Sequence, residues 1–210
     1  MQNQSQLTRQ TITLKGSTKI VTEFFGYAVN SVLYQRGIYG PETFTPVKKY
    51  GLQLMVTTDP GLTKYLSSVL KQISEWLIEG RLQKLVLVIC KLDGGETIER
   101  WAFDVQTDQE CVNEGKTHEK SEEEIQREIQ AVVRQITASI TFLPLLNDVC
   151  TFDLLCYTDK DSDVPLQWEE SEAKYIANQA EVKLRSFSTS VHTVEPMVAY
   201  KAEEDEFSLL

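Results

Sequence analysis

The sequence predicts an α+β fold in which helices cover one face of an antiparallel sheet. Three long segments carry apolar side chains at helical spacing, which is typical of amphipathic helices. Between and after them lie short segments whose apolar residues alternate or run continuously, as strands do. These segments do not follow the strand–helix–strand alternation that builds a parallel sheet, so the sheet is expected to be antiparallel.

Each predicted helix carries its own start or stop signal. The first runs from about 16 to 37 and ends at Gly37, a residue that suits a helix C-terminus. The second begins at Asp59-Pro60, where aspartate can cap the helix and proline fits its first turn. The third begins at Ser121, which forms a capping box with Glu124.

Four segments are predicted to form strands. Residues 52–56 are expected to form a strand or one arm of a hairpin, and the continuous apolar run 85–90 indicates a strand covered on both faces. A turn at 93–95 leads into the alternating strand 101–105. Residues 150–158 alternate again and form a third clear strand.

Two stretches lack a clear pattern. Residues 107–119 are polar and rich in turn formers, so a loop is expected there. Beyond residue 159 the strand pattern weakens, although 181–192 and 194–200 remain strand-like. The predicted fold class therefore depends on the elements before residue 159.

Composition disfavours two classes of partner. The chain has 210 residues, which suits one domain, and its 21 Lys+Arg against 31 Asp+Glu give a net charge of −10. The longest basic run is Lys48-Lys49, so neither nucleic acid nor anionic membrane is expected as a direct partner. We see no signal peptide and no apolar run long enough to span a membrane. A protein or peptide partner is expected.

We find no arrangement of residues that supports catalysis. The four cysteines show no C-x-x-C spacing, and His118 and His192 give no metal-ligand pattern. Cys150 and Cys156 lie in an apolar strand, where small buried side chains are expected. We therefore expect no enzymatic activity, no metal and no cofactor. An enzyme is the competing interpretation, and it would be a cysteine hydrolase that uses the thiol of Cys150 or Cys156.

The polar face of the third helix is a candidate interaction surface. Opposite its apolar stripe lie Arg127, Ala131, Arg134 and Ala138. Two alanines that alternate with two arginines allow another backbone to approach, and arginine is favoured at interface hot spots. An ordinary solvent-exposed helix face is the alternative interpretation.

Seven motifs resemble those of the HORMA domain family and stand in the same order. They are YQRGIY (34–39), ERWAFDV (99–105), VVRQITASITFLPLL (132–146), FDLLCYTDKD (152–161), WEES (168–171), LRSF (184–187) and VHTVEPMVAYK (191–201). Within the family they are most similar to the spindle assembly checkpoint branch. The resemblance covers 12–201, which we take as one HORMA domain with a flexible N-terminal arm, 1–11, and an acidic C-terminal tail, 202–210.

The resemblance implies a fold and a mechanism. Three helices would lie on an antiparallel sheet, and residues 159–201 would form a mobile C-terminal safety belt. The family has open and closed conformers, and in the closed one the belt traps an extended peptide. The implied partners are the activator of the anaphase-promoting complex, the coiled-coil checkpoint receptor at the kinetochore, a second copy of the chain, and an AAA+ ATPase with its adaptor. The implied location is the nucleus and cytoplasm, and the kinetochore in mitosis.

The resemblance also assigns roles to residues. The strand that would pair with the peptide consists of Phe152, Asp153, Leu154, Leu155, Cys156, Tyr157 and Thr158. Trp76 and Trp168 match aromatic residues near the peptide and the belt. Arg134 and Gln135, with Phe142 beyond them, match the surface that pairs an open copy with a closed one.

Four residues match positions linked to the change of conformer: Leu14, Pro196, Val198 and Tyr200. Leu14 matches an N-terminal residue that packs differently in the two forms. Pro196 departs from the family, which more often has a hydroxyl residue there. Because proline has no N–H to donate to a strand ladder, we expect Pro196 to shift the balance between the conformers.

Within this fold two functions remain open. The favoured one is a checkpoint adaptor that captures the activator and delays anaphase. The other is a HORMA scaffold that bridges components of a translesion DNA polymerase. The motifs ERWAFDV and TFLPLL fit the checkpoint branch better.

Overall fold

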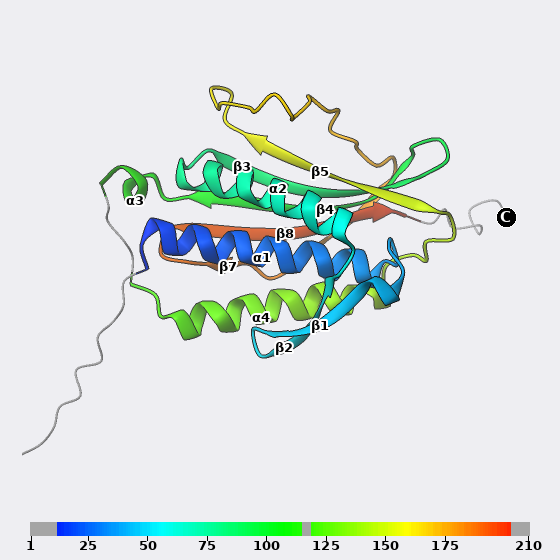
Figure 1. Cartoon of the computed structure of the whole chain (residues 1–210), viewed down its shortest axis with the longest axis horizontal. Coiled ribbons are helices and arrows are strands. Elements are labelled where there is room, and N and C mark those ends of the chain that lie inside the picture. Colours follow the sequence, from blue (N-terminus) through cyan, green and yellow to red (C-terminus); the bar gives the residue numbers. More distant parts are fainter. Residues whose placement is uncertain (1–11, 115–118, 203–210) are drawn as a thin grey trace, which may run out of the picture.

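The computed structural model describes residues 12–114 and 119–202. The predicted N-terminal arm, His118 and residues 203–210 of the predicted acidic tail lie outside these ranges. Three long helices and one antiparallel sheet make up most of the described chain (Figure 1), as the sequence predicts.

Two of the three long helices begin where their capping residues predict, and the first begins at Leu14, two residues before the expected start. The long ones are α1 (Leu14–Gln35), α2 (Pro60–Ile78) and α4 (Glu122–Ala138). Asp59 accepts a hydrogen bond from the Leu62 N–H, and Ser121 accepts one from the Glu124 N–H. None of the helices in the described part of the chain has the length and apolar character needed to cross a membrane.

A short helix, α3 (Gln109–Glu114), lies where a loop was expected, so the prediction for 107–119 was wrong in part. The Gln109 side chain donates to the Gly80 carbonyl at 3.3 Å, and Cys111 is buried with its thiol 3.5 Å from the Ser190 carbonyl. These long-range contacts hold a six-residue helix that has no apolar stripe of its own.

The sheet has the strand order β5-β3-β4-β8-β6, with the two-residue β7 also beside β8. Its strands are β3 (Leu82–Lys91), β4 (Thr97–Thr107), β5 (Cys150–Thr158), β6 (Gln179–Lys183), β7 (Phe187–Ser188) and β8 (His192–Lys201). All of the pairings are antiparallel. The C-terminal strands thus widen the sheet on the β4 side and leave β5 at the opposite edge. A separate hairpin is formed by β1 (Phe44–Lys49) and β2 (Leu52–Thr57).

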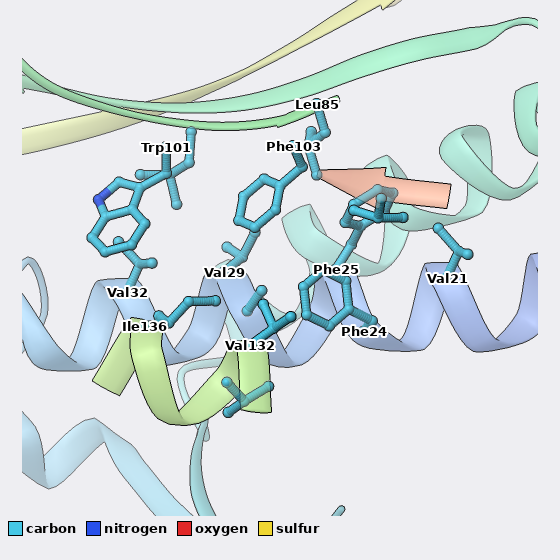
Figure 2. Close-up of a cluster of buried hydrophobic side chains, with 14 of the residues drawn as sticks. Val21, Phe24, Phe25, Val29, Val32, Leu85, Trp101, Phe103, Val132 and Ile136 are labelled. Carbon is cyan, nitrogen blue, oxygen red and sulfur yellow. The ribbon is translucent and has the colours of Figure 1, made fainter. Parts of the chain in front are cut away.

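The main core lies between the helices and one face of the sheet. Phe24 and Phe25 of α1 meet Phe103 of β4 with ring centroids 5.9 and 5.8 Å apart (Figure 2). Phe24 also packs against Phe187, at 4.7 Å, and so reaches the C-terminal part of the chain. Edge-to-face aromatic pairs of this kind contribute beyond the area that they bury. The core therefore joins α1 to both halves of the sheet.

A buried ion pair joins the end of α1 to β4. The Arg36 Nε donates to Glu99 Oε2 at 2.9 Å, and both side chains are almost fully buried. The Trp101 indole donates to the other oxygen of Glu99 at 2.6 Å, and Arg36 also donates to the Pro144 carbonyl at 2.6 Å. Burial raises the pKa of Glu99 more than the neighbouring Arg36 lowers it.

A second buried polar cluster joins the start of α1 to the C-terminal strands. The Ser17 hydroxyl lies 2.6 Å from Nδ1 of His192 and 2.5 Å from the Thr189 hydroxyl. His192 Nε2 lies 3.3 Å from the Leu77 carbonyl. Burial lowers the pKa of His192 to about 4, although the Leu77 carbonyl acts in the opposite direction.

Replacing Glu99→Ala should lower the free energy of unfolding by about 3–5 kcal/mol, because Arg36 would stay buried without its counter-charge. Urea denaturation followed by tryptophan fluorescence measures the loss. Glu96→Ala is the control, because Glu96 forms ion pairs only at the surface, with Lys91 and Lys201, and its loss should change stability far less. Equal losses in both variants would contradict the role given to the buried pair.

Stability should fall on acidification between pH 6.5 and about 4, because folding keeps His192 neutral. The folded pKa lies below the ordinary value of 6.5, so the contribution is complete above pH 6.5 and is lost as the pH falls through this window. In His192→Gln the loss of stability over the window should be smaller by up to about 3 kcal/mol. Urea denaturation at a series of pH values measures it, and an identical pH dependence in both proteins would contradict the prediction.

Candidate functional site

The strand β5 lies at the edge of the sheet and presents two different faces. Phe152, Leu154 and Cys156 pack against the main core under the helices. Leu155 and Tyr157 pack against a smaller apolar cluster on the opposite face. Both side-chain faces are therefore used for packing within the protein. What remains is the backbone edge that points away from β3.

Within the described residues, no strand pairs with this outer edge of β5. Two tyrosines border it, since the rings of Tyr39 and Tyr65 lie 6.2 and 5.9 Å from the Phe152 ring. Burial raises the pKa of Tyr65, while a hydrogen bond with the Leu154 backbone acts in the opposite direction. An unpaired edge offers a row of N–H and C=O groups to another extended chain.

The segment that follows β5 forms an arch beside this edge (Figure 1). We use the name arch for residues 159–178, which connect β5 to β6 at the far side of the sheet. Its first part is fixed to the end of α2 and to β3. The Trp76 indole donates to the Asp163 carbonyl at 3.1 Å, and Arg81 donates to the Asp161 carbonyl at 2.6 Å. The rings of Trp76 and Trp168 meet edge to face at 5.0 Å.

The second part of the arch is fixed to the sheet. Lys174 forms an ion pair with Asp153 of β5, which raises the pKa of the lysine. The next residue, Tyr175, stacks with the guanidinium of Arg100 on β4 at 5.2 Å. Ile176 is buried. The arch is thus held at both ends, with the unpaired edge of β5 between the two anchors.

The predicted conformer-switch residues lie at the opposite side of the sheet and at the start of α1. Val198 of β8 is fully buried between Trp101 of β4 and Val182 of β6. Tyr200 contacts Phe142, with ring centroids 6.5 Å apart. Leu14 is the first residue of α1. The structure therefore separates these residues from the β5 edge.

Pro196 lies in β8 without disturbing the pairing with β4, where it stands opposite Phe103. Its carbonyl accepts a hydrogen bond from the Leu184 N–H at 3.0 Å, just after β6 ends at Lys183. The backbone nitrogen of a residue points to the same side as its carbonyl in a strand. The missing N–H thus faces Leu184, at the point where the ladder with β6 ends, and proline is tolerated at such an end.

The predicted self-association residues lie at the end of α4 and just beyond it. The Arg134 side chain is exposed, and Phe142 is 43% exposed. Gln135 is already engaged, because its side-chain oxygen accepts a hydrogen bond from the Arg185 N–H at 2.6 Å. The surface therefore combines α4 with the chain between β6 and β7.

The two cysteines of β5 are poor nucleophiles. Burial raises the pKa of Cys156 to about 12 and also raises the pKa of Cys150. A nucleophilic cysteine needs a lowered pKa, because the thiolate is the reactive species. The thiols thus give no support to a cysteine hydrolase.

Sequence reasoning missed several residues that shape the site. Tyr39, Tyr65 and the pair Lys174–Asp153 border the edge or fix the arch. Lys174 and Asp153 are polar residues 21 positions apart, and nothing in the local pattern relates them. Position 174 does carry a backbone signal in the structure, a φ of 47°, which is unusual for lysine.

Comparison with known proteins relates the chain to proteins of the mitotic checkpoint. The HORMA domain family model matches residues 17–192. The chain is 58% identical to the mitotic spindle assembly checkpoint protein MAD2A of Dictyostelium discoideum, over 92% of this chain and 95% of that protein. It is 56% identical to human MAD2A, over 93% and 96%. A chain from the crystal structure of the mitotic checkpoint complex superposes with a TM-score of 0.82 at 45% identity, over 89% of this chain and 99% of that one.

Two other similarities are weaker or shorter. Subunit 2 of DNA polymerase zeta from Drosophila melanogaster is 33% identical, but over only 42% of this chain and 44% of that protein. HTP-2 of C. elegans, solved with a closure motif of HIM-3, shares the fold with a TM-score of 0.73 at 13% identity, over 96% and 98%. The family match and the identities to the checkpoint proteins agree with the motifs in the sequence, so the chain belongs to the HORMA domain family, in the branch of the spindle assembly checkpoint proteins.

Proposed function

We propose that the protein is a spindle assembly checkpoint adaptor, without catalytic activity, that captures an extended peptide of a partner on the outer edge of β5. The observation that carries the proposal is the unpaired edge of β5 beside an arch that is fixed at both ends. The checkpoint proteins named above match this chain over almost their whole length, and this match supports a function in the checkpoint.

Capture at this edge is β-augmentation, in which an added strand pairs through backbone hydrogen bonds. The unused N–H and C=O groups of β5 would pair with the peptide, while Trp76, Trp168 and Tyr65 would contact its side chains. The arch would then cross over the bound peptide. Dissociation would require the arch to detach from Asp153 or from Trp76, so release would be slow.

The captured partners we propose are the activator of the anaphase-promoting complex and the coiled-coil checkpoint receptor of the kinetochore. The arrangement with β8 beside β4 would be the closed conformer. In the open conformer, residues 159–201 would pack differently. The sequence of this segment would then allow two packings of similar free energy. An AAA+ ATPase with its adaptor would reopen the closed form. The protein would act in the nucleus and cytoplasm, and at kinetochores in mitosis.

A scaffold for translesion DNA polymerase is the second candidate. The similarity to a polymerase zeta subunit supports it, but this similarity covers less than half of either chain. The two candidates predict different ligands for the same edge. Binding of an activator peptide, compared with a peptide from the catalytic polymerase subunit, separates them.

The edge-pairing mechanism predicts that the effect of N-methylation on peptide binding alternates from one peptide residue to the next. In a strand only alternate N–H groups point toward a given neighbour, so methylating one alternate set should abolish binding and methylating the other should spare it. A series of singly N-methylated activator peptides, measured by fluorescence anisotropy with the full chain, gives the pattern. Losses without this periodicity would exclude backbone pairing, and tight binding of the polymerase peptide alone would favour the scaffold function.

Weakening the anchor of the arch should shorten the lifetime of the complex. Lys174→Gln removes the ion pair with Asp153, and because this pair is partly exposed, dissociation should accelerate about two- to fivefold. The measurement is displacement of a labelled peptide by an excess of unlabelled peptide, and the difference should shrink at high salt. Lys183→Gln, at an exposed position on β6, is the control. Equal dissociation rates in the three proteins would contradict the role of the anchor.

Charge reversal on α4 should separate self-association from peptide capture. Arg134 is exposed on α4, which lies at the opposite side of the molecule from β5 in Figure 1, so Arg134→Glu should bind peptide normally and lose the pairing of two copies. Size-exclusion chromatography of the peptide-bound protein tests it. A dimer of unchanged stability would refute the assignment of this surface.

A further inference from the structure

A groove of about 640 Å³ lies between α1, α2 and the β1–β2 hairpin. It shares no lining residue with β5, the arch or the self-association residues Arg134, Gln135 and Phe142. Its walls are largely apolar, with Tyr27 from α1, Val56 from β2, and Leu70 and Ile78 from α2. Ile78 is 41% exposed, so the apolar surface is open to solvent at that end.

The end of the groove near the start of α1 has polar groups without partners. Thr18 is 2% exposed, and its hydroxyl has no hydrogen-bond partner among the residues that the structure describes; the same holds for the hydroxyl of Thr22. Both threonines line the groove. A buried hydroxyl without a partner is uncommon in folded proteins and needs an explanation.

The same end is positively charged. Lys15 and Lys19 line the groove, are exposed, and have no carboxylate partner within residues 12–114 and 119–202. No acidic residue stands in the first turn of α1, so the helix macrodipole adds to their positive potential. The one groove carboxylate, Glu23, is paired with Lys49 at 2.7 Å. The groove therefore suits a segment that combines carboxylates with apolar side chains.

The chain itself carries such a segment, Glu203–Leu210, in which four acidic residues precede Phe207, Leu209 and Leu210. We propose that the groove binds this segment from a second copy of the chain. The carboxylates would face Lys15, Lys19 and the threonine hydroxyls, and the apolar residues would lie along Leu70 and Ile78.

The segment of the same copy cannot make these contacts together. Ala202 lies beside Arg36, the residue that caps the C-terminal end of α1, because both line one cavity. Lys19 stands seventeen positions before Arg36, which is about 26 Å along a helix that rises about 1.5 Å per residue. The four acidic residues span at most about 14 Å when extended. Only a second copy can bring the whole acidic run beside both lysines, since Lys15 stands about 32 Å before Arg36 along the helix.

The test is binding of a labelled peptide of residues 202–210 to the full chain, by fluorescence anisotropy at low salt. We expect saturable binding that weakens about tenfold in Lys15→Glu/Lys19→Glu and also weakens in Ile78→Asp. Lys64→Glu/Lys71→Glu is the matched control, since these exposed lysines of α2 do not line the groove. A peptide with its four acidic residues changed to amides should bind as weakly as the charge-reversed groove.

Absence of binding, or equal binding to the groove variants and the control, would overturn the proposal. So would a peptide of residues 1–11 that binds with the same dependence on Ile78, since the groove would then hold the N-terminal segment. Circular dichroism and capture of the activator peptide, which does not use the groove, verify that each variant is folded. Arg134→Glu should still bind the tail peptide, so this contact and the self-association proposed for α4 can fail independently.

Discussion

The buried ion pair between Arg36 and Glu99 is the constraint on which the arrangement of the sheet depends. Two buried charges are tolerated only when each has enough hydrogen-bond partners. Here the Trp101 indole donates to Glu99, and the Pro144 carbonyl accepts from Arg36. The pair fixes the point where α1 ends, where β4 begins and where the chain passes from α4 toward β5. Glu99 also stands opposite Tyr200, so β8 is positioned by the same residue. Three of the motifs that resemble the family meet at this cluster.

Most of the fold was predictable because its signals are local. The caps at Asp59 and Ser121 and the apolar stripes give the three long helices, and the strands β2 to β5 follow from apolar runs, alternation and turns, whereas β1 was not predicted. The helix α3 was not predictable, because it is held by Gly80 and Ser190, which lie far away in the sequence. The strands after residue 178 were weakly indicated by the sequence, since β6 and β7 are short and three of the five residues of β6 are exposed.

The candidate site was only partly predictable. Alternation identifies 150–158 as a strand, but an edge strand and an inner strand with the same packing have the same pattern. What leaves β5 at the edge is the pairing of β8 with β4, which joins residues about ninety positions apart. The anchors of the arch, Lys174 on Asp153 and Tyr175 on Arg100, are likewise set by the tertiary structure. The family resemblance supplied the role of the edge, and the residues alone did not.

The unpaired edge of β5 also has a cost for the empty protein. The backbone groups of β5 that point away from β3, on about every second residue of the nine, could pair with the same edge of another molecule, and identical edges of this kind promote aggregation. The arch and the Tyr65 side chain stand where such a neighbour would have to approach. Proteins commonly shield their edge strands with charged residues, bulges or covering loops. The segment that would hold a ligand would thus also be a guard against polymerisation, and its selection would reflect solubility as well as binding.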